Sequence, residues 1–306
     1  MRRFTLIALA TLAASAAGCQ ESGFDERRET ERPLKVQHAL GESKVPGQAK
    51  RAITLTVDAL DDALAVGVRP LRAAVRGGRV PAYLRSRARG VQIVPPVTEL
   101  DVEAIDAAQP DLILASAAHQ SHLYNRLRRI APTVMTENGG VEWKLDLRLH
   151  GEALGRTNDA EDLLTDYDRR AARVRRELGS EPRRTEVSVV QVTRRGLRAA
   201  GLASFPGSVL GDLDLSRPPA QDRPRPSEIV PPERMSSVDG DLLLVSVARG
   251  AGEALRRLEA TPEWRRLRAV RARRVARVEG GTWWSGGGIL AARAALRDIE
   301  RALDRR

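Results

Sequence analysis

Two histidines, His119 and His122, stand three positions apart and could bring two imidazole nitrogens to one metal ion. Zinc and similar ions in proteins need three or four converging nitrogen, oxygen or sulfur ligands. The only other histidines are His38 and His150, and no acidic partner is evident near the pair. We therefore interpret His119 and His122 as loop residues that could line a binding site, and we expect no metal site.

The chain lacks the residue patterns of common catalytic and phosphate-binding sites. Its one cysteine, Cys19, lies near the N-terminus, and no Gly-x-Ser-x-Gly segment is present to hold a nucleophilic serine. The glycine-rich run at 280–290 has neither the lysine nor the strand-to-helix context of a nucleotide phosphate loop. We expect a protein that is not an enzyme and holds no cofactor; a chelatase-like enzyme is the alternative, which turnover would reveal.

Aromatic residues are scarce, so adjacent tryptophans stand out. Trp283 and Trp284 are two of only four tryptophans and are followed by the glycines at 286–288. Two neighbouring indoles beside such a turn are hard to bury together, so we expect one at a ligand site and one in the core. Trp264 leads an amphipathic segment together with Leu267, which favours a core position.

The composition is that of a globular chain with a formal net charge of +11. Of 51 basic residues only four are lysines, so 47 are arginines, spread along the chain and interleaved with acids. A nucleic-acid-binding surface would be a clustered basic patch, with aromatic side chains for base stacking. The arginine content therefore indicates codon bias, and we expect no nucleic-acid partner.

The N-terminus has the layout of an export signal. Arg2 and Arg3 precede an apolar run at 4–17, which is too short to span a membrane comfortably, and Ala16, Ala17 and Gly18 lead to Cys19. This arrangement resembles the lipobox of bacterial lipoproteins. The resemblance implies cleavage of residues 1–18, lipidation of Cys19 and a polar tether at 19–35.

The remaining sequence alternates short apolar runs with helical segments, which indicates parallel α/β structure. Residues 45–49 carry Pro and Gly and are expected to form a loop. We expect strands at 36–39, 52–55, 66–71, 91–94, 111–115, 133–135, 187–192 and 242–247, and helices at 58–65, 101–108 and 121–130.

One long helix is expected at 158–178, near the middle of the chain. Apolar residues recur there at three- and four-residue spacing, acids lie near its start and arginines near its end. Asn158 and Glu161 have the spacing of a capping box. At about 1.5 Å per residue the helix would span about 30 Å, enough to join two lobes.

A spacing recurs in the two halves. Glu103 stands eight residues before Asp111 and a buried strand, and Glu233 stands eight residues before Asp241 and a second buried strand. The recurrence predicts two lobes of related build with one equivalent acid in each.

At this point a family resemblance is visible. The segments PPVTELDVEAIDAAQPDLIL, ASFPGSVLGDLDLSRP, EIVPPERMSSVDGDLLLVS and WWSGGGILAARAALRDIERAL follow one another between His38 and the C-terminus. In number and order they resemble the substrate-binding lipoproteins of ABC importers for ferric siderophores and cobalamin.

The resemblance implies an α/β fold of two Rossmann-like lobes, 36–150 and 181–306, joined by a single long rigid helix within 151–180. It implies that Glu103 and Glu233 dock on arginines of the membrane permease. It also implies a monomer held by its lipid on the outer face of the cytoplasmic membrane.

The expected ligand is a ferric siderophore in the cleft between the lobes, with iron present only as part of that ligand. The siderophore saturates the iron, so the protein must supply aromatic walls and cations to the chelator. Candidate residues at predicted strand ends are Tyr83, Trp143, Arg148, Arg194, Phe205, Arg249, Trp283 and Trp284.

Related ligands stay open at this point. Haem needs a histidine or tyrosine axial ligand, which His119 or Tyr83 could supply. Cobalamin and a metal ion also stay open as ligands. Among siderophores, hydroxamate, citrate-type and catecholate chelates all fit the sequence, and the arginines favour residual negative charge on the ligand.

Overall fold

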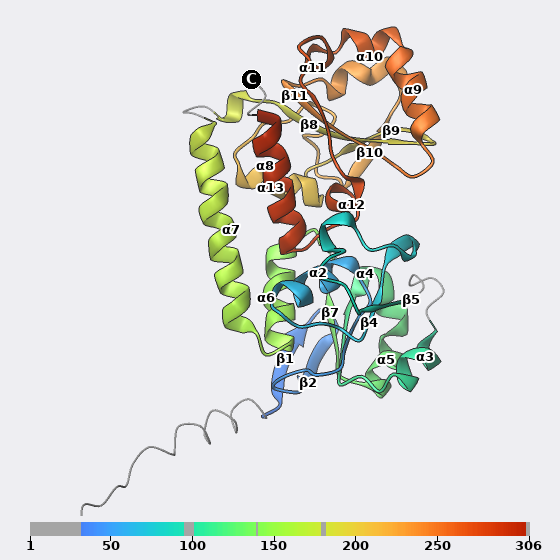
Figure 1. Ribbon diagram of the computed structural model, residues 1–306, viewed down its shortest axis with the longest axis vertical. Coiled ribbons are helices and arrows are strands. Elements are labelled where there is room, and N and C mark those ends of the chain that lie inside the picture. The colour runs from blue at the N-terminus through green and yellow to red at the C-terminus, as the bar shows by residue number, and fades with distance from the viewer. Residues whose placement is uncertain (1–31, 95–100, 139, 179–181, 304–306) are drawn as a thin grey trace, which may run out of the picture.

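The computed structural model describes residues 32–94, 101–138, 140–178 and 182–303. Two five-stranded sheets lie at opposite ends of one long helix, α7 (Thr157–Glu177), as Figure 1 shows. The predicted α/β fold with two Rossmann-like lobes is confirmed. The expected signal peptide, Cys19 and nearly all of the tether lie outside the described residues. Within the described ranges, every helix is too short or too polar to span a bilayer.

The first lobe is a parallel sheet with a hairpin beside it. The strand order β5-β4-β3-β6-β7 matches the first five strands of the Rossmann order, 3-2-1-4-5. The hairpin consists of β1 (Leu34–His38) and β2 (Gly41–Val45). The sheet strands are β3 (Ala52–Thr54), β4 (Arg72–Ala74), β5 (Gln92–Val94), β6 (Leu112–Ser116) and β7 (Thr133–Thr136). The helices include α2 (Val57–Ala65), η2 (Ala82–Leu84), α3 (Val102–Ala107), α4 (Ala117–Gln120), η4 (Ser121–Leu123), α5 (Tyr124–Ile130) and α6 (Trp143–Ala153).

The second lobe repeats this order as β10-β9-β8-β11-β12, with β9 antiparallel to both of its neighbours. The strands are β8 (Val187–Thr193), β9 (Gly196–Ala200), β10 (Ser227–Val230), β11 (Leu242–Val247) and β12 (Val275–Arg277). The helices include α8 (Phe205–Asp212), η6 (Pro232–Val238), α9 (Gly252–Ala260), α10 (Pro262–Arg266), α11 (Arg268–Arg271), α12 (Gly280–Trp283) and α13 (Ile289–Leu303).

Asp111 and Asp241 give the two lobes the same internal bracing. The carboxylate of Asp111 accepts the N–H of Arg51, 2.9 Å away, just before β3. The carboxylate of Asp241 accepts the N–H of Glu186, also at 2.9 Å, just before β8. Each aspartate therefore ties the start of β3 or β8, the first strand of each five-stranded sheet along the chain, to the start of its parallel neighbour, β6 or β11. The related build predicted from the eight-residue spacing is present in the structure.

The long helix α7 buries one stripe of side chains, which consists of Ala160, Leu164, Tyr167, Ala171 and Val174. Its start differs from the prediction. The helix begins at Thr157 after Arg156, and no side chain caps it. Asn158 lies inside the first turn, so the predicted capping box is wrong. The stripe, rather than the cap, holds this helix in place.

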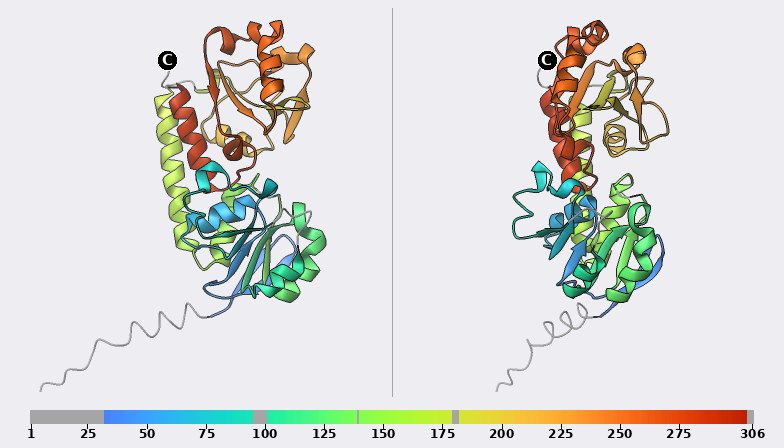
Figure 2. Two further views of the ribbon diagram at one scale, coloured as in Figure 1. Left: turned by 45° about the vertical axis from the view of Figure 1, so that its right-hand side comes forward. Right: turned by 90° about the vertical axis from the view of Figure 1, so that its right-hand side faces the viewer.

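The last helix, α13, joins the lobes a second time. It runs beside α7 in both views of Figure 2, and it also packs against α2 of the first lobe and α8 of the second. One hydrophobic core cluster contains Ala59 of α2, Leu164 of α7, Val209 of α8 and Leu296 of α13. The lobes are therefore connected through packed side chains as well as through α7.

In the first lobe one strand prediction is wrong and one strand was not predicted. The run 66–71 is a turn rather than a strand, since Val66 ends α2 and Gly67 takes a φ of +81°. The strand that pairs with β3 begins one residue later, at Arg72. The segment 41–45, for which no strand was predicted, forms β2 with Val45 buried.

Candidate functional site

The carboxyl-terminal ends of the two sheets face the same region of the molecule. The segment after β4 and the segment after β12 meet there, because a Cβ on Gly281 would lie 3.0 Å from the Cβ of Pro81. Gly140, after β7, also meets Gly287, whose Cβ would lie 2.8 Å from the Cα of Gly140. Ligands of open α/β sheets bind at this edge. Functional side chains are therefore expected in this inter-lobe region.

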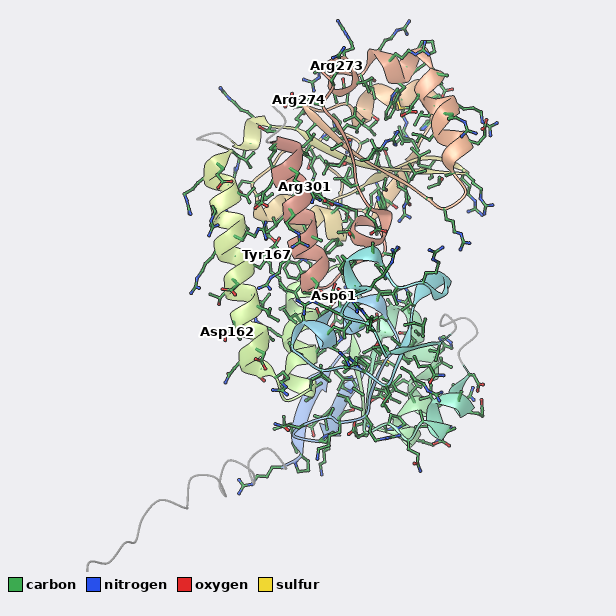
Figure 3. The ribbon with its side chains drawn as sticks, viewed as in Figure 1. Asp61, Asp162, Tyr167, Arg273, Arg274 and Arg301 are labelled. Atoms are coloured by element: carbon green, nitrogen blue, oxygen red, sulfur yellow. The ribbon has the colours of Figure 1, made fainter. Side chains whose placement is uncertain are left out.

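The glycine run at 286–288 leads into the N-terminus of α13, and that N-terminus holds a carboxylate of the chain itself. Both oxygens of Asp61 accept N–H groups, from Leu290 at 2.7 Å and from Ala291 at 3.0 Å. Asp62 accepts the N–H of Ile289 at 3.3 Å. Figure 3 shows Asp61 where α2 meets the start of α13. The orphan N–H groups and positive dipole end of α13 are therefore satisfied from the other lobe.

Further acids and a histidine surround this contact. Burial, then the charge of Asp62, raises the pKa of Asp61 well above its usual range, and burial does the same for Asp62. Asp146 of α6 accepts the N–H of Gly140 at 2.9 Å, and burial raises its pKa to about 7. His150 lies with its Nδ1 2.8 Å from Asp62, and burial lowers the pKa of this imidazole. Burial therefore disfavours the charged forms of all four side chains.

Tyr83 of η2, which is also in the first lobe, lies beside the acids of this cluster. Its hydroxyl oxygen is buried and has no hydrogen-bond partner of standard geometry among the described residues. Burial first, and the charge of Asp61 second, raise the pKa of the phenol. The ring is half-buried and packs against the core. Tyr83 therefore lies in the inter-lobe region, where a ligand contact was predicted, but its hydroxyl group is buried in the protein.

Trp143 and Phe205, two predicted ligand contacts, come together in the packing between the lobes. Trp143 is 1% exposed, and its indole N–H donates to Ser208 Oγ at 2.9 Å. Ser208 in turn donates to the carbonyl of Phe205, whose side chain is 6% exposed. Trp143 also stacks edge-on against Tyr167 of α7. Both predicted residues therefore seal the lobe interface instead of offering a surface to a ligand.

The adjacent tryptophans differ in burial: one is packed in the core, as expected, and the other is partly open. Trp283 is fully buried and donates to Asp298 at 2.8 Å. Trp284 is half-buried, and the guanidinium carbon of Arg198 lies 4.6 Å from the centre of its ring. Arg198 also donates through Nε to Ser227 at 3.0 Å. The indole ring and Ser227 therefore hold the guanidinium of Arg198 in one orientation.

The predicted arginines occupy two different faces. Arg194 is exposed in the two-residue turn between β8 and β9, and Arg249 is exposed just after β11, so both lie at the carboxyl edge of the second sheet. Arg148 lies on α6 and makes two hydrogen bonds, of 2.7 and 3.3 Å, to Glu161 of α7. The prediction that Arg148 faces the ligand is therefore not supported, because the α6–α7 contact engages its guanidinium.

His119 and His122 are exposed in the short helices α4 and η4, not in a loop. In the part of the chain that the structure describes, no group of three or more His, Cys, Asp or Glu side chains could hold a metal ion. Asp61 and Asp62 instead accept N–H groups from the start of α13.

Arg198 and the Asp61–Asp62 pair lie in this region but were not predicted as site residues from the sequence. Arg198 lies inside β9, a five-residue strand without an apolar run, and no local pattern marks it as a binding residue. The acids were visible as Asp61-Asp62 within an apolar helix, where buried acids need partners. That signal could have pointed to a long-range capping contact.

The two predicted docking acids lie on helical segments after the third strand of each sheet. Glu103 on α3 is 80% exposed and pairs with Arg126 of α5 at 2.8 Å. Glu233, near the start of η6, is exposed. The equivalent topological positions put one accessible carboxylate on each lobe.

Comparison with known proteins agrees with this geometry. Residues 52–280 match the family described as periplasmic binding protein. A probable siderophore-binding lipoprotein of Bacillus subtilis, YfiY, is 29% identical over 95% of this chain and 94% of its own length. The achromobactin-binding periplasmic protein of Dickeya dadantii is 32% identical over 82% of this chain and 86% of its own length.

The solved structures agree with the fold. The crystal structure of Staphylococcus aureus SirA complexed with staphyloferrin B superposes with a TM-score of 0.79 at 26% identity. The match covers 89% of this chain and 98% of SirA.

Proposed function

The chain belongs to the periplasmic binding protein family, and from this premise we propose that it captures a ferric siderophore between its lobes for an ABC importer. A binding protein of this kind holds its ligand without changing it chemically. The iron belongs to the ligand, and the protein contributes shape, aromatic surface and charge.

The observation that carries the proposal is the pairing of Arg198 with Trp284. The ring supports the guanidinium from one side, and Ser227 fixes its Nε, so little side-chain entropy is lost when an anion binds. Arg194 and Arg249 lie exposed at the carboxyl edge of the second sheet. Together these cations suit a ferric chelate that keeps uncoordinated carboxylates or a net negative charge.

The names of the relatives support the same ligand. YfiY is named as a probable siderophore-binding protein, the Dickeya relative as achromobactin-binding, and SirA was crystallised with staphyloferrin B. Haem and cobalamin are the rival ligands that a titration must separate from a siderophore.

We place the protein outside the cytoplasmic membrane, lipidated on Cys19 and acting as a monomer. The lipobox-like sequence before Cys19 supports the anchor, and YfiY is also named a lipoprotein. We assign Glu103 and Glu233 to permease docking, because each lobe exposes one of them at an equivalent position.

A fluorescence titration tests the ligand class. Trp143, Trp264 and Trp283 are 1%, 4% and 0% exposed, whereas Trp284 is half-buried beside Arg198. The chain from Gln20 onward would be titrated with ferric citrate, ferric catecholate and ferric hydroxamate chelates, haem, cobalamin and free divalent metals. We expect saturable quenching by a carboxylate-bearing ferric chelate.

Two tryptophan variants show which indole is responsible for the fluorescence quenching. Trp284→Phe should lose most of the quenching, and Trp264→Phe, in the core of the second lobe, should keep it. A response only to haem, cobalamin or free metal would overturn the siderophore proposal. Chemical change of the bound ligand would overturn its assignment as a binding protein.

A further inference from the structure

Six arginines within ten residues crowd one end of the second lobe. Arg265 and Arg266 end α10, Arg268 and Arg271 lie on α11, and Arg273 and Arg274 form the turn before β12. All six are exposed. The only acid between residues 261 and 278 is Glu263. On this surface, which we call the arginine crest, exposed arginines are concentrated with almost no acid between them in the sequence.

One arginine of the crest has a structural task. Arg268 lies 2.7 Å from Glu186, 3.5 Å from Asp239 and 3.7 Å from Asp241. Asp239 also accepts the N–H groups of Arg268 and Ala269 at the start of α11. These contacts fix α11 against the amino-terminal ends of β8 and β11.

The other five arginines have no such task. Arg265, Arg266, Arg271, Arg273 and Arg274 form no ion pair with any acid among the described residues. Five neighbouring guanidinium groups without acidic partners repel one another, and together they attract an extended anionic partner. Stabilisation of the fold therefore does not explain why these five arginines are clustered.

The position of the crest separates it from the ligand region. Arg273 and Arg274 directly precede the amino-terminal end of β12, and the candidate ligand residues lie at the carboxyl-terminal edge of the same sheet. The crest is also remote from the start of the described chain. In Figure 1, β1 and β2 lie at one end of the long axis and α10 and α11 at the other. Figure 3 labels Arg273 and Arg274 at that far end.

We propose that the arginine crest binds the anionic phospholipid surface of the membrane on which the protein is tethered. The proposal rests on the lipid anchoring that is part of the proposed function. A lipid at Cys19 would hold the molecule by its first-lobe end only. An anionic phospholipid surface attracts a cluster of basic side chains, and guanidinium groups pair readily with phosphates. Attachment at both ends would lay the long axis along the membrane and keep both lobes at one height above it.

Vesicle co-sedimentation tests the proposal without lipidation. The chain from Gln20 onward, which keeps all described residues, is mixed with phosphatidylcholine vesicles that contain either no phosphatidylglycerol or about a third of it; each basic residue near such a surface strengthens binding about five-fold. We expect binding to the anionic vesicles only, and its loss as salt shortens the Debye length. Inorganic phosphate at equal ionic strength should not displace the protein, because the partner is an extended surface.

Two charge-matched variants decide whether the crest is responsible. The crest variant carries Arg265→Gln, Arg266→Gln, Arg271→Gln, Arg273→Gln and Arg274→Gln and retains Arg268. The control variant changes five exposed arginines elsewhere, namely Arg69, Arg128, Arg129, Arg173 and Arg176, to Gln. We expect the crest variant to lose vesicle binding by at least about ten-fold and the control to stay within about two-fold of the original chain.

Equal losses in both variants would overturn the proposal, because net charge alone would then explain binding. Equal binding to neutral and anionic vesicles would also overturn it. Siderophore titration of the crest variant should be unchanged, which separates this test from that of the proposed function. If the variant with five substitutions fails to fold, two double variants replace it: Arg265→Gln with Arg266→Gln, and Arg273→Gln with Arg274→Gln. Each should bind anionic vesicles more weakly than the original chain, by a smaller factor.

Discussion

Asp61 occupies the space that a side chain at position 288 would need. An ideal Cβ on Gly288 would lie 2.5 Å from the Cγ of Asp61. The carboxylate comes from α2 of the first lobe, and the glycine stands just before α13 at the end of the chain. The absence of a side chain at 288 is therefore what lets the first lobe cap the last helix.

The substitution Gly288→Ala should destabilise the protein by about 1–3 kcal/mol, because the new methyl group must displace a buried carboxylate that caps α13. Denaturant-induced unfolding measures the loss. The control is Gly252→Ala in α9, where an added Cβ meets nothing within 4 Å and φ is not positive. That change should be neutral or stabilise by up to about 1 kcal/mol. Equal effects of both substitutions would refute this account of the contact.

The elements that could be predicted from the sequence are those determined by residues close to one another in the chain. The α7 stripe was visible because Leu164, Tyr167, Ala171 and Val174 recur at helical spacing, and all four are buried. The related build of the lobes was visible in one spacing, and its physical cause is the bracing by aspartates at the strand starts. The helix start was missed because packing of the stripe outweighs a cap.

Side-chain direction at the candidate site depends on contacts that sequence does not show. Trp283 and Trp284 are neighbours, yet one is sealed against Asp298 and the other lies under Arg198. Trp143 was expected at the ligand and is instead locked by Ser208, 65 residues away. These partners come from other elements, so no local pattern could have separated the open indole from the buried ones.

The pH dependence of stability should carry a contribution from Asp146. Its pKa is raised from 3.8 to about 7 in the folded protein, chiefly by burial. The folded state therefore holds this proton more tightly than the unfolded state. The associated stability is fully present below pH 4 and is lost as pH rises to 7 and above, by about 4 kcal/mol at most.

Comparison with Asp146→Asn isolates this contribution from the other acids. The amide keeps an acceptor for the N–H of Gly140 and does not titrate. The unfolding free energy of the original chain minus that of the variant should fall between pH 4 and pH 8. Urea denaturation at a series of pH values measures it, and a difference that does not vary with pH would contradict the assignment.

Arg198 should be a determinant of ligand affinity. Arg198→Gln should weaken binding of the ferric chelate at least about ten-fold, since a charge-assisted contact in a partly dry site is lost. Arg198→Lys should be intermediate, because an ammonium keeps the charge but lacks the planar stacking on Trp284. Arg148→Gln, which removes only the pair with Glu161, should leave affinity unchanged. An equal loss of affinity in the Arg148 variant would show that general charge, and not the Trp284-supported cation, attracts the ligand.

Charge reversal of the two docking acids should separate transport from binding. In the double variant Glu103→Lys and Glu233→Lys, uptake of the labelled ferric chelate by cells should be lost, because both lobes would repel the arginines expected on the permease. Chelate affinity measured by fluorescence should stay within about two-fold, since neither carboxylate is part of the Arg198–Trp284 pair.

The internal pair of Glu103 with Arg126 is exposed, so its loss should cost less than about 1 kcal/mol of stability. The control reverses two other exposed acids, Glu152→Lys and Glu177→Lys, with the same change in net charge. Uptake by the control should match the original chain. If the control fails in uptake as well, the effect belongs to overall charge; if the docking variant loses affinity, these two carboxylates act on the ligand and not on the permease.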